Sequence, residues 1–97
     1  MYKLRVTASA LEDLRFLKKS VQGNLLAKME RYLSAEPLRS SLNRKPLRPN
    51  EVSSWELRVR AFRVFYEVNP ESRIVLIKAV GRKEHNRLLI RGKEVWL

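Results

Sequence analysis

Three arginines alternate with apolar residues in the segment from Trp55 to Val68, and their types and spacing could bind an anion. Arg58, Arg60 and Arg63 stand at positions where an exposed strand more often carries Thr, Lys or Glu. A guanidinium group is planar and can donate two parallel hydrogen bonds to a carboxylate or a phosphate. The segment therefore indicates recognition of an anionic partner.

The alternation of side chains along a strand assigns these arginines to one face of a sheet. We expect two strands, over 55–60 and 62–68, whose apolar residues face the helices. The opposite face then carries one set of side chains: Glu56, Arg58, Arg60, Arg63, Phe65 and Glu67. Lys78, in a further strand expected over 73–80, can join this face, but both faces of that strand are apolar and leave its orientation open.

Two interpretations fit this charged face. Exposed Arg/Glu pairs across neighbouring strands are common in sheets, and each is worth only about 0.5 kcal/mol. An exposed aromatic ring beside arginines, however, is typical of surfaces that bind single-stranded nucleic acid. The excess of arginine over glutamate, together with Phe65, favours the second interpretation.

The first third of the chain must supply the helices that support this sheet. Alternation over Tyr2–Thr7 predicts a strand, and apolar residues at helical spacing predict helix over 10–33. Ser9 suits the N-terminus of the first helix, and Ser20 could cap a second one. A break is expected between Lys18 and Gly23, which gives two helices or one strongly kinked helix.

A long connection over 34–50 follows the helices and is rich in Pro, Ser and Asn. A loop of this length in a small domain is usually functional or covers the sheet. We expect its basic residues to contribute to nucleic-acid binding: Arg44, Lys45 and Arg48. At the end of the chain, Arg91 and Gly92 predict a turn between 88–90 and 95–97, and Trp96 is expected to be a packing residue.

This order of elements predicts a single α+β domain over 1–97. It has an N-terminal strand, a helical hairpin and a mostly antiparallel sheet with helices on one face only. The other face of the sheet is expected to be free.

The charge of the chain limits the classes of partner. It has 21 Lys and Arg against 10 Asp and Glu, a formal net charge of +11, which favours nucleic acid or an acidic protein. It has no Cys and one His, so a disulfide is excluded and a metal site is not expected. The N-terminal segment has neither a signal peptide pattern nor an apolar membrane span, and we expect a cytoplasmic protein.

The stretch WELRVRAFRVFYEV, followed by IVLIKAVGRKEH, resembles the RelE/ParE-like toxins of type II toxin–antitoxin modules. The resemblance covers nearly the whole chain, and its RelE-like branch is favoured. It implies a ribosome-dependent mRNA endonuclease that works without a metal ion or another cofactor. In that reaction the 2′-hydroxyl attacks the adjacent phosphate and leaves a 2′,3′-cyclic phosphate.

The resemblance also implies roles for individual residues. Arg63 matches the phosphate-binding arginine of the family. Arg58 stands where these enzymes often have a lysine, and Lys83 or its neighbour Arg82 stands where they have a second catalytic arginine. A general base and a general acid are also required.

The chain departs from the family at the positions that would move protons. A Tyr often follows the second basic position in the family, but here the sequence reads KEHNRLLI. Arg58 is a poor base because the pKa of a guanidinium lies above about 12. Proton transfer would therefore fall to Glu56 or His85.

The resemblance finally implies a cognate antitoxin as a protein partner, besides the ribosome and mRNA. Two other functions stay open at this point. Some members of the superfamily inhibit DNA gyrase and cleave no RNA. A degenerate toxin acting mainly through antitoxin binding is the third alternative.

Overall fold

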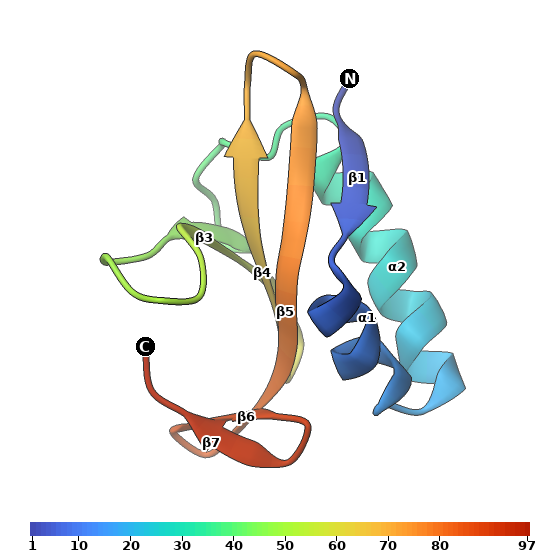
Figure 1. Ribbon diagram of the computed structural model, residues 1–97, viewed down its shortest axis with the longest axis vertical. Coiled ribbons are helices and arrows are strands. Elements are labelled where there is room, and N and C mark those ends of the chain that lie inside the picture. The colour runs from blue at the N-terminus through green and yellow to red at the C-terminus, as the bar shows by residue number, and fades with distance from the viewer.

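A computed structural model describes all residues from Met1 to Leu97. Figure 1 shows two helices packed on one side of a strongly curved sheet. Its elements follow one another as β1 (Lys3–Val6), α1 (Ala8–Arg15), α2 (Lys19–Leu33), β2 (Arg44–Pro46), β3 (Trp55–Val59), β4 (Phe62–Asn69), β5 (Ile74–Glu84), β6 (Arg87–Ile90) and β7 (Lys93–Val95). No helix is long and apolar enough to cross a membrane.

The sheet has the order β2-β3-β4-β5-β6-β7, and all of these neighbours are antiparallel. The remaining strand, β1, runs parallel to the first half of β5. The predicted α+β class, with a helical hairpin and a mostly antiparallel sheet, is confirmed. The predicted C-terminal hairpin is also present as β6 and β7, whereas the short strand β2 within the long connection was not expected.

The main core lies between the helices and the sheet. Leu14 from α1 and Leu25, Met29 and Leu33 from α2 pack against apolar residues of the sheet. The sheet contributes the residues that alternation assigned to this face, with Leu57, Val59, Val64 and Tyr66 buried and Trp55, Phe62 and Val68 partly buried. The hydroxyl of Tyr66 donates a hydrogen bond to the carbonyl of Pro37 at 2.7 Å, and burial raises the pKa of this hydroxyl. The orientation predicted for β3 and β4 is therefore confirmed.

The two helices begin and end close to the predicted places, with different caps. Thr7, rather than Ser9, caps α1 by accepting a hydrogen bond from the backbone N–H of Ala10. The break falls at 16–18, just before the predicted interval, and α2 begins after Lys18 with no side-chain cap. Ser20 lies inside α2 and is not a cap.

A β-bulge in β5 explains why its faces could not be assigned from the sequence. Phe65 pairs with Ala79 and the next residue, Tyr66, pairs with Ile77, so Lys78 has no partner on β4. A bulge of this kind moves the following residues to the other phase of alternation. Ile77 and Val80 therefore both reach the main core, although alternation alone would place them on opposite faces.

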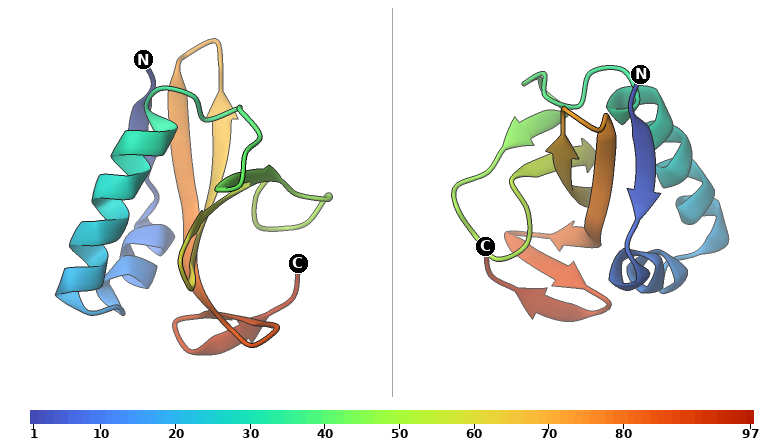
Figure 2. Two further views of the ribbon diagram at one scale, coloured as in Figure 1. Left: turned by 180° about the vertical axis from the view of Figure 1, so that it is seen from behind. Right: turned by 45° about the horizontal axis from the view of Figure 1, so that its top comes forward.

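The face away from the helices is not free, which corrects the expectation from the sequence. Phe65, Ala79 and Leu88 form a second buried cluster there, covered by Leu47, Val52, Ile90 and Val95. The covering residues come from the connection after β2 and from the C-terminal hairpin. Both segments lie across the sheet from the helices in the two views of Figure 2. The exposed part of this face is consequently narrower than predicted.

Candidate functional site

Two of the predicted arginines meet at one carboxylate on this face. Arg58 and Arg63 are paired residues of β3 and β4, and Glu56 lies two residues before Arg58. Oε2 of Glu56 is 3.3 Å from Nε of Arg58 and 3.9 Å from Nε of Arg63. The Glu56 side chain is 5% exposed, Arg63 12% and Arg58 47%. One carboxylate thus faces two guanidinium groups, and one of these reaches solvent.

The tight β3–β4 hairpin holds the guanidinium of Arg63 in place. Arg60 has the left-handed backbone conformation at the turn (φ 55°), which lets a two-residue connection join the strands. Nη1 of Arg63 donates hydrogen bonds to the carbonyls of Arg60 and Phe62, each at 2.8 Å. Both bonds use the same nitrogen, so Nη2 remains available for an anion.

The pKa of the Arg63 guanidinium reflects its burial beside Glu56 and Arg58. Burial lowers the pKa of its guanidinium, Glu56 acts in the opposite direction and Arg58 lowers the pKa further. Nε of Arg63 is buried and has no hydrogen-bond partner in the chain. A mostly buried cation beside a second cation gains from an additional negative charge. The arrangement therefore favours binding of a phosphate-like anion.

A groove of about 900 Å³ lies beside this cluster. It runs between the connection after β2 and the C-terminal hairpin, and in Figure 2 the C-terminus lies next to that connection. Its lining includes four of the predicted site residues: Lys45, Arg48, Glu56 and Lys83. Glu56 therefore joins the arginine cluster to the groove.

The register of the strands explains why three of these residues, Lys45, Glu56 and Lys83, lie on one face. Lys45 pairs with Glu56 across β2 and β3. Arg63 pairs with Gly81, and Lys83 follows on the same face two residues later. The backbone N–H of Lys83 donates to the carbonyl of Ala61 at 2.7 Å, which fixes the end of β5 against the β3–β4 turn.

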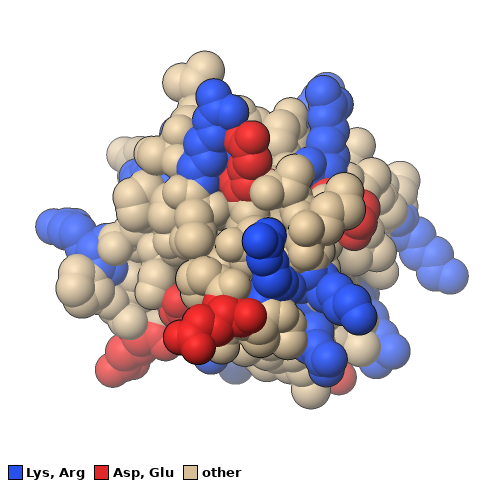
Figure 3. Space-filling view, turned by 90° about the horizontal axis from the view of Figure 1, so that it is seen from above, with Lys and Arg blue, Asp and Glu red and all other residues tan.

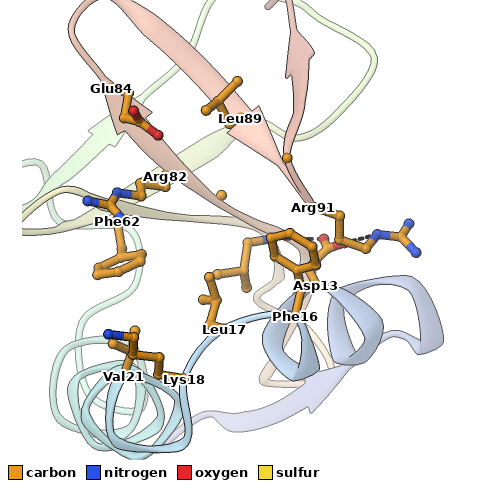
Figure 4. Close-up of a pocket in the computed structure, with 13 residues that line it drawn as sticks. Asp13, Phe16, Leu17, Lys18, Val21, Phe62, Arg82, Glu84, Leu89 and Arg91 are labelled. Atoms are coloured by element: carbon orange, nitrogen blue, oxygen red, sulfur yellow. Dashed lines mark hydrogen bonds and ion pairs between the residues drawn. The ribbon is translucent and has the colours of Figure 1, made fainter.

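Arg82 lies away from this groove, unlike its neighbour Lys83. It lines a smaller pocket of about 340 Å³ on the helix side of the sheet, and its guanidinium lies 5.8 Å from the centre of the Phe62 ring. Figure 4 shows this pocket, with Arg82 over Phe62 and with Leu17 and Val21 from the helical region. Of the two alternatives that the sequence left open, only Lys83 lines the groove beside the arginine cluster.

The smaller pocket also contains a buried carboxylate that ties three elements together. Asp13 of α1 accepts a hydrogen bond from the backbone N–H of Val80 at 3.0 Å, and it pairs with Nε of Arg91 at 2.8 Å. Figure 4 marks both interactions with dashed lines. The Asp13 side chain is 1% exposed. It thus connects α1 to β5 and to the turn of the C-terminal hairpin.

The remaining predicted RNA-binding residues differ in position. The guanidinium of Arg44 donates to the carbonyls of Tyr32 and Glu36 and lies 5.5 Å from the Tyr32 ring centre, on the helix side. Arg60 is exposed in the hairpin turn and lines a small depression with Arg58. Lys78 is exposed at the bulge and does not line the groove.

Two further expectations concern Phe65 and His85. The prediction of a solvent-facing Phe65 is wrong, because this side chain is fully buried in the second cluster and has no exposed ring for stacking. His85 is exposed in the turn between β5 and β6, with a φ of 58°, and it does not line the groove. Its neighbour Asn86 does line the groove.

Several residues of the C-terminal hairpin line the groove although the sequence did not predict them there. Arg87 and Glu94 form an ion pair, with 3.2 Å between Nε of Arg87 and Oε1 of Glu94. Trp96 directly follows the end of β7 and lines the same groove. Trp96 was expected to pack, but it is 84% exposed, and this correction changes which aromatic residue can contact a ligand. The hairpin itself was predicted, but not that it folds back towards the connection after β2.

The positive charge of the chain does not by itself locate the site. The face seen in Figure 3 has Lys and Arg side chains both at its edges and grouped from its centre towards the lower right, with acidic side chains also present. What distinguishes the groove is that its cations lie beside Glu56, the carboxylate that also faces Arg63.

Comparison with known proteins assigns a family to this arrangement. Residues 4–87 match the family model of the ParE toxin of the type II toxin–antitoxin system parDE. A comparison with curated protein sequences found no match.

Solved structures of toxins have the same fold. The RelBE2 toxin–antitoxin complex of Mycobacterium tuberculosis contains a chain with a TM-score of 0.71 and 29% identity, over 84% of this chain and 98% of the other. The isolated RelE toxin of E. coli gives a TM-score of 0.68 and 26% identity, over 88% and 87% of the two chains. The RelE–RelB complex of Pyrococcus horikoshii is 16% identical and supports the fold alone, with a TM-score of 0.68 over 87% and 97% of the chains. The chain therefore belongs to the RelE/ParE family of toxins from type II toxin–antitoxin systems.

Proposed function

We propose that this toxin is a ribosome-dependent endonuclease that cleaves mRNA in the cytoplasm and thereby inhibits translation. One observation carries the proposal. Arg58 and Arg63 share the carboxylate of Glu56, and Glu56 and Lys83 both line the neighbouring groove. Three cations and a carboxylate on one sheet face are the groups that cleavage of a phosphodiester requires.

The proposed reaction needs no group beyond the RNA and the protein. The 2′-oxygen attacks the adjacent phosphorus, the bond from phosphorus to the 5′-oxygen breaks, and the products are a 2′,3′-cyclic phosphate and a 5′-hydroxyl. Negative charge accumulates on the phosphoryl oxygens in the transition state. Nη2 of Arg63 and the ammonium of Lys83 would stabilise that charge, and Arg58, as the most exposed of the three, would meet the phosphate first.

Two protons must also move, one from the 2′-hydroxyl and one to the 5′-oxygen. We assign the first to Glu56, because its carboxylate lines the groove and His85 does not. Lys83 lines the same groove and can supply the second proton. His85 stays a candidate for either step only if the β5–β6 turn moves when the ribosome binds.

A cognate antitoxin is the proposed protein partner. The M. tuberculosis structure and one E. coli structure are complexes of a RelE-type toxin with its RelB-type antitoxin, the latter with a TM-score of 0.56. A chain with a net charge of +11 suits a partner that brings acidic side chains. Formation of such a complex also provides a test of correct folding that does not depend on RNA cleavage.

Alanine variants of the neighbours Lys83 and Arg82 test the proposed site. The purified chain is incubated with ribosomes that carry a defined mRNA, and the rate of cleavage is measured. Lys83→Ala should lower this rate about 10²-fold, because one cation at the phosphate is lost. Arg82→Ala removes the same amount of charge on the helix side and should change the rate little. Equal losses in the two variants would mean that only overall charge matters.

A second candidate function is inhibition of DNA gyrase. The observation in its favour is that the matching family model is that of the ParE toxin. This function predicts loss of DNA supercoiling by purified gyrase in the presence of the chain, with no cleavage of ribosome-bound mRNA. Supercoiling is read from the mobility of plasmid DNA in a gel, so the two candidates give opposite results in two simple assays.

A further inference from the structure

Trp96 is the most exposed aromatic residue of the groove that contains Lys83. It directly follows Val95, which packs against the second cluster, so the backbone on its N-terminal side is anchored. The Trp96 side chain itself is 84% exposed and lines the groove together with Lys45, Arg48 and Lys83. A large exposed ring therefore lies beside three cations, next to a backbone anchored at Val95.

This combination has a specific chemical meaning. A Trp side chain in a protein core stabilises the fold mainly through burial of its ring. The exposed ring of Trp96 does not stabilise the fold in this way. Proteins that bind single-stranded nucleic acid combine exposed aromatic rings, on which bases stack, with a basic groove that follows the backbone. Phe65 cannot take the stacking role because it is buried, so Trp96 is the aromatic side chain of the groove that can.

We propose that Trp96 stacks on an unpaired nucleobase of RNA while Lys45, Arg48 and Lys83 contact phosphates of the same strand. This inference rests on the proposed function for the identity of the polymer. It adds a base-contacting residue to the site, 13 positions after Lys83 in the sequence and directly after the end of β7. Stacking on Trp96 would thereby fix the position of the RNA strand along the groove relative to Arg63.

A protein segment is the other possible occupant, and the charges favour RNA over it. Four cations line the groove against two carboxylates. Both carboxylates are already engaged, Glu56 with Arg58 and Arg63 and Glu94 with Arg87. Phosphates would thus meet cations without competing carboxylates. The pocket on the helix side, lined by Phe16, Leu17 and Val21, offers a more apolar surface for a protein chain.

Tryptophan fluorescence can test the stacking directly, because the chain has only two Trp residues. The second one, Trp55, is half buried and stacks on Tyr66 at a centroid distance of 6.1 Å. The probe is a six-residue single-stranded adenosine oligonucleotide with 2′-O-methyl groups, which blocks cleavage. We expect it to quench the fluorescence of the wild-type chain and not that of Trp96→Phe, which reports Trp55 alone.

Affinities for the same oligonucleotide give a second, independent readout. Trp96→Ala should weaken binding about 5- to 150-fold, as loss of one stacked base predicts, and Trp96→Phe should restore most of it. Phe16→Ala is the matched control, since Phe16 is 60% exposed at the pocket on the helix side, and it should bind like the wild type. Thermal melting of each variant verifies the fold.

The results separate this inference from the proposed function. Quenching and an alanine effect without mRNA cleavage would support Trp96 as a base-stacking residue and reject the nuclease. Cleavage of ribosome-bound mRNA with neither quenching nor an alanine effect would overturn the role of Trp96 alone. Unchanged RNA affinity together with weaker antitoxin binding in Trp96→Ala would also overturn it and assign Trp96 to a protein interface.

Discussion

Replacing Arg63 by alanine is expected to lower the rate of mRNA cleavage about 10²- to 10³-fold, the loss that follows removal of one preorganised donor at a developing negative charge. The carbonyls of Arg60 and Phe62 hold its guanidinium beside Glu56, so the donor does not have to be ordered when the phosphate arrives. The rate is measured in a single turnover on ribosomes that carry a defined mRNA, and growth arrest on expression should disappear with it.

Two further variants make the Arg63 result specific. Arg63→Lys keeps a positive charge but loses the fork that contacts two carbonyls and an anion together, so it should recover only part of the activity. Arg5→Ala, at an exposed position of β1, should leave the rate unchanged. Antitoxin binding verifies that each variant folds. Full cleavage by Arg63→Ala at the normal protein level would remove the basis of the proposed site.

Replacing Asp13 by alanine should have the largest effect on stability. The buried carboxylate accepts the N–H of Val80 and pairs with Arg91, so the variant leaves a buried donor without a partner and releases the C-terminal hairpin from α1. The free energy of unfolding should fall by about 2 to 3 kcal/mol. For a domain of this size that corresponds to a melting temperature lower by about 10 to 20 °C.

Neighbouring substitutions show whether burial is the cause. Glu12→Ala changes an exposed carboxylate on the same helix and should have almost no effect on melting. Arg91→Ala removes a side chain that is 45% exposed but leaves the buried Asp13 carboxylate without its cation, so it should also lower the melting temperature. Equal melting temperatures for Asp13→Ala and Glu12→Ala would show that the Asp13 contacts do not stabilise the fold.

Much of the fold followed from short-range patterns. The alternation in β3 and β4 correctly separated Leu57, Val64 and Tyr66 from Glu56, Arg58 and Arg63, because one face is apolar and the other charged. The helical hairpin also followed from the spacing of apolar residues. The faces of β5 could not be assigned from alternation, because a bulge at Lys78 shifts the alternation of its side chains. The sequence gives no sign of this bulge.

The site was only partly predictable, because long-range packing decides which residues meet. Lys83 and Arg82 are neighbouring cations, and the sequence left both as candidates. They lie on opposite faces of β5, so Lys83 lines the groove and Arg82 lines the pocket on the helix side. Phe65 is buried and Trp96 is exposed, the reverse of what the sequence predicted, for a similar reason. The connection after β2 and the C-terminal hairpin cover Phe65, and the position of these two segments depends on contacts far apart in the sequence.

The most direct test of the account is to express the chain without an antitoxin and to map the 5′ ends of cellular mRNA. We expect new ends inside coding regions, at a constant position relative to the reading frame, that are absent when the Arg63→Ala variant is expressed. Growth arrest with no new mRNA ends, accompanied by loss of DNA supercoiling, would contradict the account and assign the toxin to gyrase inhibition.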